Sequence, residues 1–180
     1  LHARTAQMLT HEKLERMLDA PNAEDAWKIA VQCGYPELER CTLGAVEEAL
    51  SAGRKKLYRE LDALVPDHRV VELFAIRYDY HNAKVAVKAG ENDRERLMID
   101  CGRCPVKELA GGTLRSDSPA LRRAVEGAKE LMAQESAQKV DLLLDRACYE
   151  EMSALAEETA SDFLKAYVRL QIDAVNLRTL

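Results

Sequence analysis

The sequence predicts an all-α protein, from the spacing of its apolar residues and from the places where that spacing is interrupted. Apolar side chains recur every three or four residues along most of the chain, and Pro and Gly fall between these periodic runs. Composition agrees, since hydrophobic residues make up 47%, charged residues 32% and aromatic residues only 5%. A chain of 180 residues is long enough to bury about 70% of its unfolded surface.

Composition and charge also exclude several classes of function. The net charge is −5 with acidic and basic residues interspersed, so we expect no nucleic-acid partner. Without an apolar run near ~20 residues or a signal peptide, we expect no membrane span and a cytoplasmic location. Gly111-Gly112-Thr113 lacks the lysine and spacing of a phosphate-binding loop. We therefore predict neither direct nucleotide binding nor a cofactor.

Short helices are expected in the first part of the chain. One covers His2 to Leu9, a second starts after the cap Thr10 and runs to about Ala20, and a third runs from Glu24 to Cys33. Asn22 caps the third helix and Gly34 closes it. The buried stripe expected on the second helix consists of Leu14, Met17 and Leu18.

Two long helices follow, separated by a proline. The first covers Leu43 to Leu64 and ends at Val65-Pro66, because the residue before proline disfavours the α conformation. The second covers His68 to Lys88 and is capped by Asp67. Apolar residues lie on two nearly opposite sides of this second helix, so we expect it to be packed on both sides.

Polar residues form two edges between the apolar stripes of the His68–Lys88 helix. The broader edge, which we expect to be in solvent, consists of Arg77, His81, Lys84 and Lys88. The other edge is made of short side chains and contains Asp79 and Asn82, which are neighbours on one helix face. We expect this pair to need partners such as open N–H groups at the end of another helix.

The stretch 89–118 is rich in glycine and divides the chain about in half. It contains one expected helical turn, at Pro105 to Leu109. Ser118 caps a helix from Pro119 to about Ala133, and further helices are expected at Val140–Glu157 and Ser161–Leu180. The predicted organisation is a first repeat at 1–90, a connector at 91–118 and a truncated second repeat at 119–180.

A shift of 94 residues aligns two segments of the chain. It places Asp79 on Asp173, Asn82 on Asn176 and Lys84 on Arg178. The apolar phase is kept upstream over about three helical turns, although matching Tyr58 to Tyr149 requires a gap of three residues. The likeness is local, and we interpret it as an internal repeat.

The two aligned segments resemble signatures of a known family. Tyr78-Asp79-Tyr80-His81-Asn82-Ala83-Lys84 is similar to the Asp-Tyr-His-Asn-Leu-Lys signature of the C subunit of V/A-type rotary ATPases, whose eukaryotic counterpart is subunit d. Ile172-Asp173-Ala174-Val175-Asn176-Leu177-Arg178 is similar to the Ile-Asp-x-x-Asn-Leu-Arg stretch one repeat later. Ala83 stands where the family usually has Leu.

The resemblance implies a funnel of three helical repeats, of which this chain spans two, as the N-terminal half or so of a longer protein. It implies a non-enzymatic subunit that links the central rotor stalk to the membrane ring in ATP-coupled proton or sodium transport, with those components as partners. No catalytic, cofactor or metal residue is expected. The family-motif residues, expected to be structural, are Asp79, Tyr80, His81, Asn82, Lys84, Asp173, Asn176 and Arg178.

Two alternatives remain open from the residues alone. A generic helical adaptor would share all the bulk features. A zinc or redox module would use Cys101 and Cys104 with His81, but a lone Cys-x-x-Cys lacks the four ligands of a structural zinc site. Five cysteines, an odd number, favour reduced thiols. The paired glutamates, among them Glu150-Glu151, are interpreted as solvated helix faces.

Overall fold

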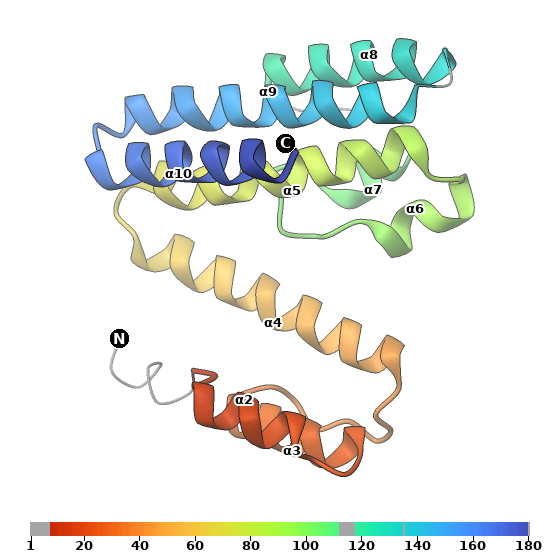
Figure 1. The fold of residues 1–180 in the computed structure, drawn as a ribbon, viewed down its shortest axis with the longest axis vertical. Helices are drawn as coiled ribbons and strands as arrows, with labels where there is room; N and C mark the ends of the chain where they lie inside the picture. The colour runs from red at the N-terminus through yellow and green to blue at the C-terminus, as the bar shows by residue number, and fades with distance from the viewer. Residues whose placement is uncertain (1–7, 112–117, 135, 180) are drawn as a thin grey trace. The chain divides into compact units, whose positions relative to one another are not determined.

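The computed structural model describes residues 8–111, 118–134 and 136–179, and within them all regular secondary structure is helical (Figure 1). This confirms the all-α class. The helices are α2 (His11–Leu18), α3 (Ala23–Gln32), α4 (Leu43–Leu64), α5 (His68–Lys88), α6 (Glu91–Leu97), α7 (Val106–Ala110), α8 (Pro119–Ala133), α9 (Ala137–Glu158) and α10 (Asp162–Thr179).

Local signals place the starts of four helices. The side chains of Thr10, Asn22, Asp67 and Ser118 each accept a backbone N–H at the start of a helix, as predicted. Both α4 and α5 have the predicted bounds. The helix predicted at His2 to Leu9 falls mostly outside the described residues, and its last two positions are not helical. Helix α6, within the predicted connector, was not anticipated.

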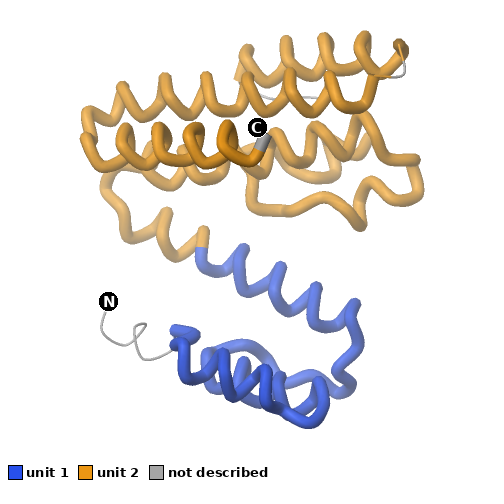
Figure 2. Tube along the Cα trace, viewed as in Figure 1, with its two compact units in different colours: residues 1–57 blue, residues 58–180 orange. Residues whose placement is uncertain are grey.

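Contacts divide the chain into two compact units, residues 1–57 and residues 58–180 (Figure 2). The boundary falls inside α4, so this helix belongs to both. In the first unit, Trp27 is 8% exposed and its indole Nε1 donates to the carbonyl of Pro36 over 2.9 Å. Gly34, with a φ of 91°, ends α3 in the left-handed conformation that glycine adopts without strain.

The buried stripe predicted for α2 is wrong. Leu14 is 42% exposed and Leu18 is 83% exposed, and only Met17 packs against the small core around Trp27 and Ala30. The reason is the small size of that core, which reaches only one side chain of this helix.

The second unit is built around α9, which contacts α5, α8 and α10 (Figure 1). Its core includes Leu73, Ile76, Leu144 and Met152, each 0% exposed. Helix α5 buries residues from both predicted stripes, among them Val71 and Leu73, and contacts α6, α7, α8 and α9. The prediction that this helix is packed on two sides is confirmed.

Helix bounds recur at the spacing of the aligned motifs. The starts of α4 and α9, Leu43 and Ala137, are 94 residues apart, and so are the starts of α5 and α10, His68 and Asp162. Helices α4 and α9 both contain 22 residues, so the alignment needs no gap between them. Several expectations stay predictions: the funnel, the third repeat and the division into 1–90, 91–118 and 119–180.

Candidate functional site: a buried polar junction on α5

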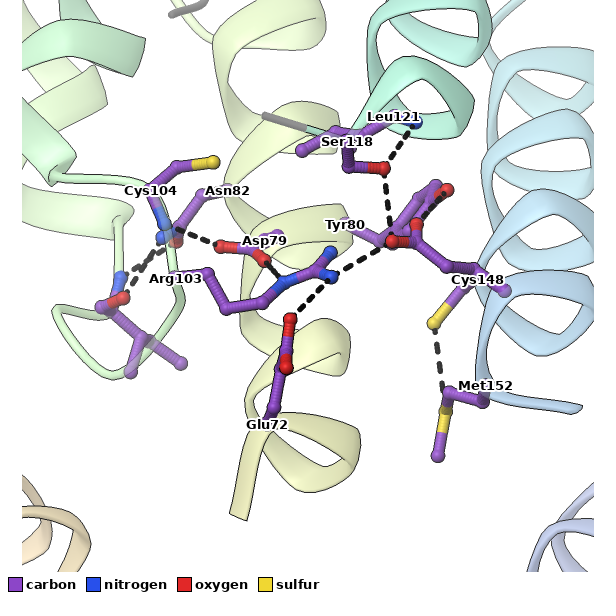
Figure 3. Close-up of polar contacts among 12 residues, drawn as sticks. Glu72, Asp79, Tyr80, Asn82, Arg103, Cys104, Ser118, Leu121, Cys148 and Met152 are labelled. Carbon is purple, nitrogen blue, oxygen red and sulfur yellow. Dashed lines mark hydrogen bonds and ion pairs between the residues drawn. The ribbon is translucent and has the colours of Figure 1, made fainter. Parts of the chain in front are cut away.

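Asp79 and Asn82 lie on one face of α5 and are both 0% exposed (Figure 3). Asn82 exchanges two hydrogen bonds with the backbone of Ile99, accepting its N–H over 2.8 Å and donating Nδ2–H to its carbonyl over 2.8 Å. Asp79 accepts the N–H of Cys104 at Oδ1 over 3.0 Å. The expected open N–H groups therefore come from the irregular segment between α6 and α7.

Arg103 connects Asp79 to α9. Its Nε donates to Asp79 Oδ2 over 2.6 Å, and its Nη1 donates to Glu151 Oε1 over 2.8 Å and lies 3.5 Å from Glu72 Oε1. Its Nη2 is buried and has no hydrogen-bond partner among the described residues. One guanidinium therefore neutralises carboxylates from two helices.

Glu151 is the second centre of the cluster. Its Oε2 accepts the phenol of Tyr80 over 2.8 Å, and its Oε1 accepts the hydroxyl of Ser118 over 2.9 Å. The same Ser118 oxygen accepts the N–H of Leu121 over 3.1 Å, which caps α8. We call the whole cluster the Asp79 junction; its members are Glu72, Asp79, Tyr80, Asn82, Arg103, Ser118 and Glu151. Figure 3 labels all of them except Glu151.

Gly102 sits where the connecting segment comes closest to α5. A methyl group at this position would overlap Asp79 Oδ1 and would lie 3.2 Å from the Asp79 backbone nitrogen. Gly102 is needed here for space, since the nearest atoms belong to a buried carboxylate and to the helix backbone. The Asp79 junction therefore depends on a residue that has no side chain at position 102.

Burial and hydrogen bonding act in opposite directions on the acids of the junction. Burial raises the pKa of Asp79, and the hydrogen bonds from Arg103 and the Cys104 amide offset part of this rise. Burial also acts to raise the pKa of Glu151, but Arg103, Tyr80 and Ser118 outweigh it and hold that pKa below its ordinary value. The two carboxylates raise the pKa of Arg103 despite its burial. The charged groups of the junction therefore join α5, α9 and the segment between α6 and α7.

The other residues of the first motif also reach beyond α5. His81 Nε2 lies 3.1 Å from the carbonyl of Leu97 at the end of α6. Lys84 donates to Asp145 over 2.6 Å, and Lys88 pairs with Asp141. The edge is in solvent as expected at Arg77, His81 and Lys88, whereas Lys84 is half-buried against α9.

The residues of the second motif have different surroundings. Asp173, Asn176 and Arg178 lie on α10, and all three are exposed. They are not part of the Asp79 junction. A role in holding helices together stays a prediction for Asp173 and Asn176, whereas Asp79 and Asn82 make such contacts in the structure.

Sequence reasoning missed two charged members of the Asp79 junction, Arg103 and Glu151. Arg103 lies inside the Cys-x-x-Cys loop, for which only a metal or redox role was weighed. The interpretation of Glu151 as solvated is wrong, since its side chain is 15% exposed. Glu150, next to it, is exposed as predicted. The missed signal was helical spacing: Glu151 follows the buried Leu144 by seven residues and Cys148 by three, which places it on the buried face.

The cysteine loop does not bring together a metal site in the described part of the chain. Cys101 and Cys104 are each 7% exposed, and no group of three His, Cys, Asp or Glu side chains there is arranged to hold a metal ion. Tetrahedral zinc sites use four protein ligands or three with water. The zinc alternative therefore has no such ligand set among the described residues and stays a hypothesis.

The fold and the junction define a helical scaffold whose buried polar groups hold segments in place. No helix in the described ranges is long and apolar enough to cross a membrane. A family model described as ATP synthase (C/AC39) subunit matches residues 1–180, so the chain belongs to that family. It is thus a subunit of a V/A-type ATPase, and other subunits of that complex are its partners. Neither the curated proteins nor the solved structures gave a match.

Proposed function

We propose that the chain is a coupling subunit that joins the central rotor stalk to the membrane ring, at the cytoplasmic edge of the complex. In this role it transmits torque between the ATP-handling head and a ring that moves protons or sodium ions, without chemistry of its own. Family membership supports the proposal, and so does the absence of a spanning helix in the described residues.

The observation that carries the proposal is the way α5 is fixed. A torque-transmitting element must resist sliding of its helices, and apolar packing alone is non-directional. Helix α5 adds directed contacts to its packing: Lys84 and Lys88 bind α9, and Asn82 and Asp79 bind the 99–104 segment. Satisfied buried polar networks make a core rigid and specify one arrangement.

Co-purification tests the partner assignment. The tagged chain is expected to retain stalk subunits and the membrane ring after detergent extraction. A variant that weakens the scaffold, Asp79→Ala, should lose both partners together at a temperature where wild type keeps them. The matched control is Glu130→Ala on the exposed face of α8, which should behave as wild type.

The generic adaptor is the competing candidate. Recovery of other protein partners without any stalk or ring subunit would favour it and would contradict the coupling role. Stoichiometric zinc in the reduced, purified protein would revive the metal-site alternative.

A further inference from the structure

Cys101 and Cys104 lie at the two ends of a tight turn in the segment that packs on α5. The chain bends at Gly102, at Arg103 and again at Cys104. Successive bends within four residues bring the first and last Cα atoms of a turn within about 7 Å. In disulfides the two Cα atoms are usually about 4.4 to 6.8 Å apart. The turn therefore holds these cysteines at a separation that a disulfide can span.

Hydrogen bonds and close packing fix the backbone on both sides of this turn. The N–H of Cys101 donates to the carbonyl of Ile99 over 2.9 Å, and the N–H of Cys104 donates to Asp79 Oδ1 over 3.0 Å (Figure 3). Between the two cysteines, Gly102 lies too close to α5 for a side chain to fit. Because groups other than the thiols order the turn, joining the two sulfur atoms requires little further ordering.

The two side chains are thiols, and each is 7% exposed. They are three residues apart in sequence, whereas every other two cysteines of the chain are at least eight residues apart. Cys33 and Cys41 belong to the first unit, and Cys148 lies on α9. Sequence and fold therefore set Cys101 and Cys104 apart as a pair.

We propose that Cys101 and Cys104 are a redox-active pair, which a low-molecular-weight disulfide oxidises to an intrachain disulfide that fixes the 99–104 segment on α5. One cysteine thiolate attacks the small disulfide, forms a mixed disulfide and releases a first small thiolate. The second cysteine thiolate attacks the protein sulfur of the mixed disulfide and releases the second small thiolate. Each protein thiol loses one proton and one electron, and the small disulfide is reduced to two thiols. The inference is independent of the coupling role.

The disulfide and the Asp79 junction act on the same backbone, so each should stabilise the other. Asn82 holds Ile99 on α5, and Asp79 holds Cys104. A segment held in this way keeps the two thiols at a high effective concentration. In return, the closed ring removes conformations from the released segment. Thermodynamic linkage requires the two effects to be equal in size.

The test equilibrates the whole chain in glutathione buffers of increasing oxidised fraction, followed by an acid quench, alkylation and tryptic digestion. Trypsin cuts after Arg103, between the two cysteines, so a disulfide leaves residues 97–103 linked to residues 104–107. We expect mass spectrometry to find this linked peptide pair in wild type and to lose it in Cys101→Ser and in Cys104→Ser. Cys33→Ser is the matched control and should keep it.

A junction variant and melting temperatures test the link to α5. Asn82→Ala leaves the N–H and carbonyl of Ile99 without their partner, so half-oxidation should require about tenfold more oxidising glutathione than in wild type. Glu130→Ala, on the exposed face of α8, should leave the half-oxidation point unchanged. In wild type, circular dichroism should show that the oxidised chain melts several degrees above the reduced chain.

Three results would overturn the inference. The first is the absence of the linked peptide pair in fully oxidised glutathione. The second is a main product in which Cys101 or Cys104 is joined to one of the other three cysteines. The third is an oxidised wild type that melts below the reduced form, since ring closure would then pull the segment away from α5. This last comparison needs no variant, so it decides the matter even where Asn82→Ala does not fold.

Discussion

Asp79 and Asp173 correspond in the two segments that the 94-residue shift aligns, but their environments are opposite. Asp79 is 0% exposed and is held by Arg103 and by the Cys104 amide. Asp173 is exposed on α10. Residues 103 and 104 bring donors to Asp79, and an aspartate is buried only where donors meet it.

Removing the Asp79 carboxylate should destabilise the second unit strongly. Asp79→Ala leaves the Cys104 N–H and part of the Arg103 charge unmatched in a buried place, so we expect a loss of about 2 to 4 kcal/mol. Asp173→Ala should change stability by less than about 0.5 kcal/mol. Urea unfolding followed by circular dichroism checks this. Tryptophan fluorescence would not, because Trp27, the only tryptophan, reports on the first unit. Equal effects of the two variants would contradict the account.

Gly102 should be intolerant of even one added methyl group. Gly102→Ala places a Cβ against the Asp79 side chain and the α5 backbone, and such overpacking typically costs about 1 to 3 kcal/mol. Gly44 is the matched control, since a Cβ there meets nothing within 4 Å and alanine suits a helix better by up to about 1 kcal/mol. The same unfolding experiment measures both variants, and a neutral Gly102→Ala would show that the close approach is not required.

At the scale of elements, the link between α9 and α10 contains an unfavourable backbone conformation. Ala160 has a φ of 53° directly after the C-cap Thr159, and this left-handed region costs a residue with a Cβ about 1 to 2 kcal/mol. Ala160→Gly should therefore raise the free energy of unfolding by up to about 1 kcal/mol, since glycine also has more freedom in the unfolded chain. A melting temperature of Ala160→Gly several degrees below that of wild type would show that the conformation of Ala160 is not unfavourable.

Helices with strong local signals could be predicted from the sequence, and weakly periodic ones could not. Both α4 and α5 were bounded correctly because Pro66 and Asp67 separate them. Helix α6, with the sequence ENDRERL, has one apolar residue and no helical period to detect. Helix α6 follows α5 directly. Just after α6 ends, the two hydrogen bonds between Asn82 and Ile99 fix the chain to α5.

The site was predictable in part for a related reason. The need of Asp79 and Asn82 for backbone donors follows from their place on a narrow helix face. Their actual partners, Arg103 and the segment around Ile99, follow only from tertiary contacts 17 to 25 residues away in sequence. The burial of Glu151 could be predicted from its helical spacing to buried residues, but its hydrogen bond with Ser118 could not.

At the scale of the whole molecule, the chain is a helical subunit of a V/A-type ATPase. The proposed coupling role requires it to connect the central stalk to the membrane ring without catalysing a reaction. The described helices provide directed contacts for stiffness, in the Asp79 junction.

Ion transport coupled to ATP hydrolysis tests the central claim most directly. The measurement compares ATPase complexes in vesicles, reconstituted with and without this chain, and records ATP hydrolysis and ion uptake in parallel. The account predicts that omission leaves the head able to hydrolyse ATP and abolishes ATP-driven ion uptake, and that adding the chain back restores uptake. Undiminished uptake without the chain would contradict the coupling role.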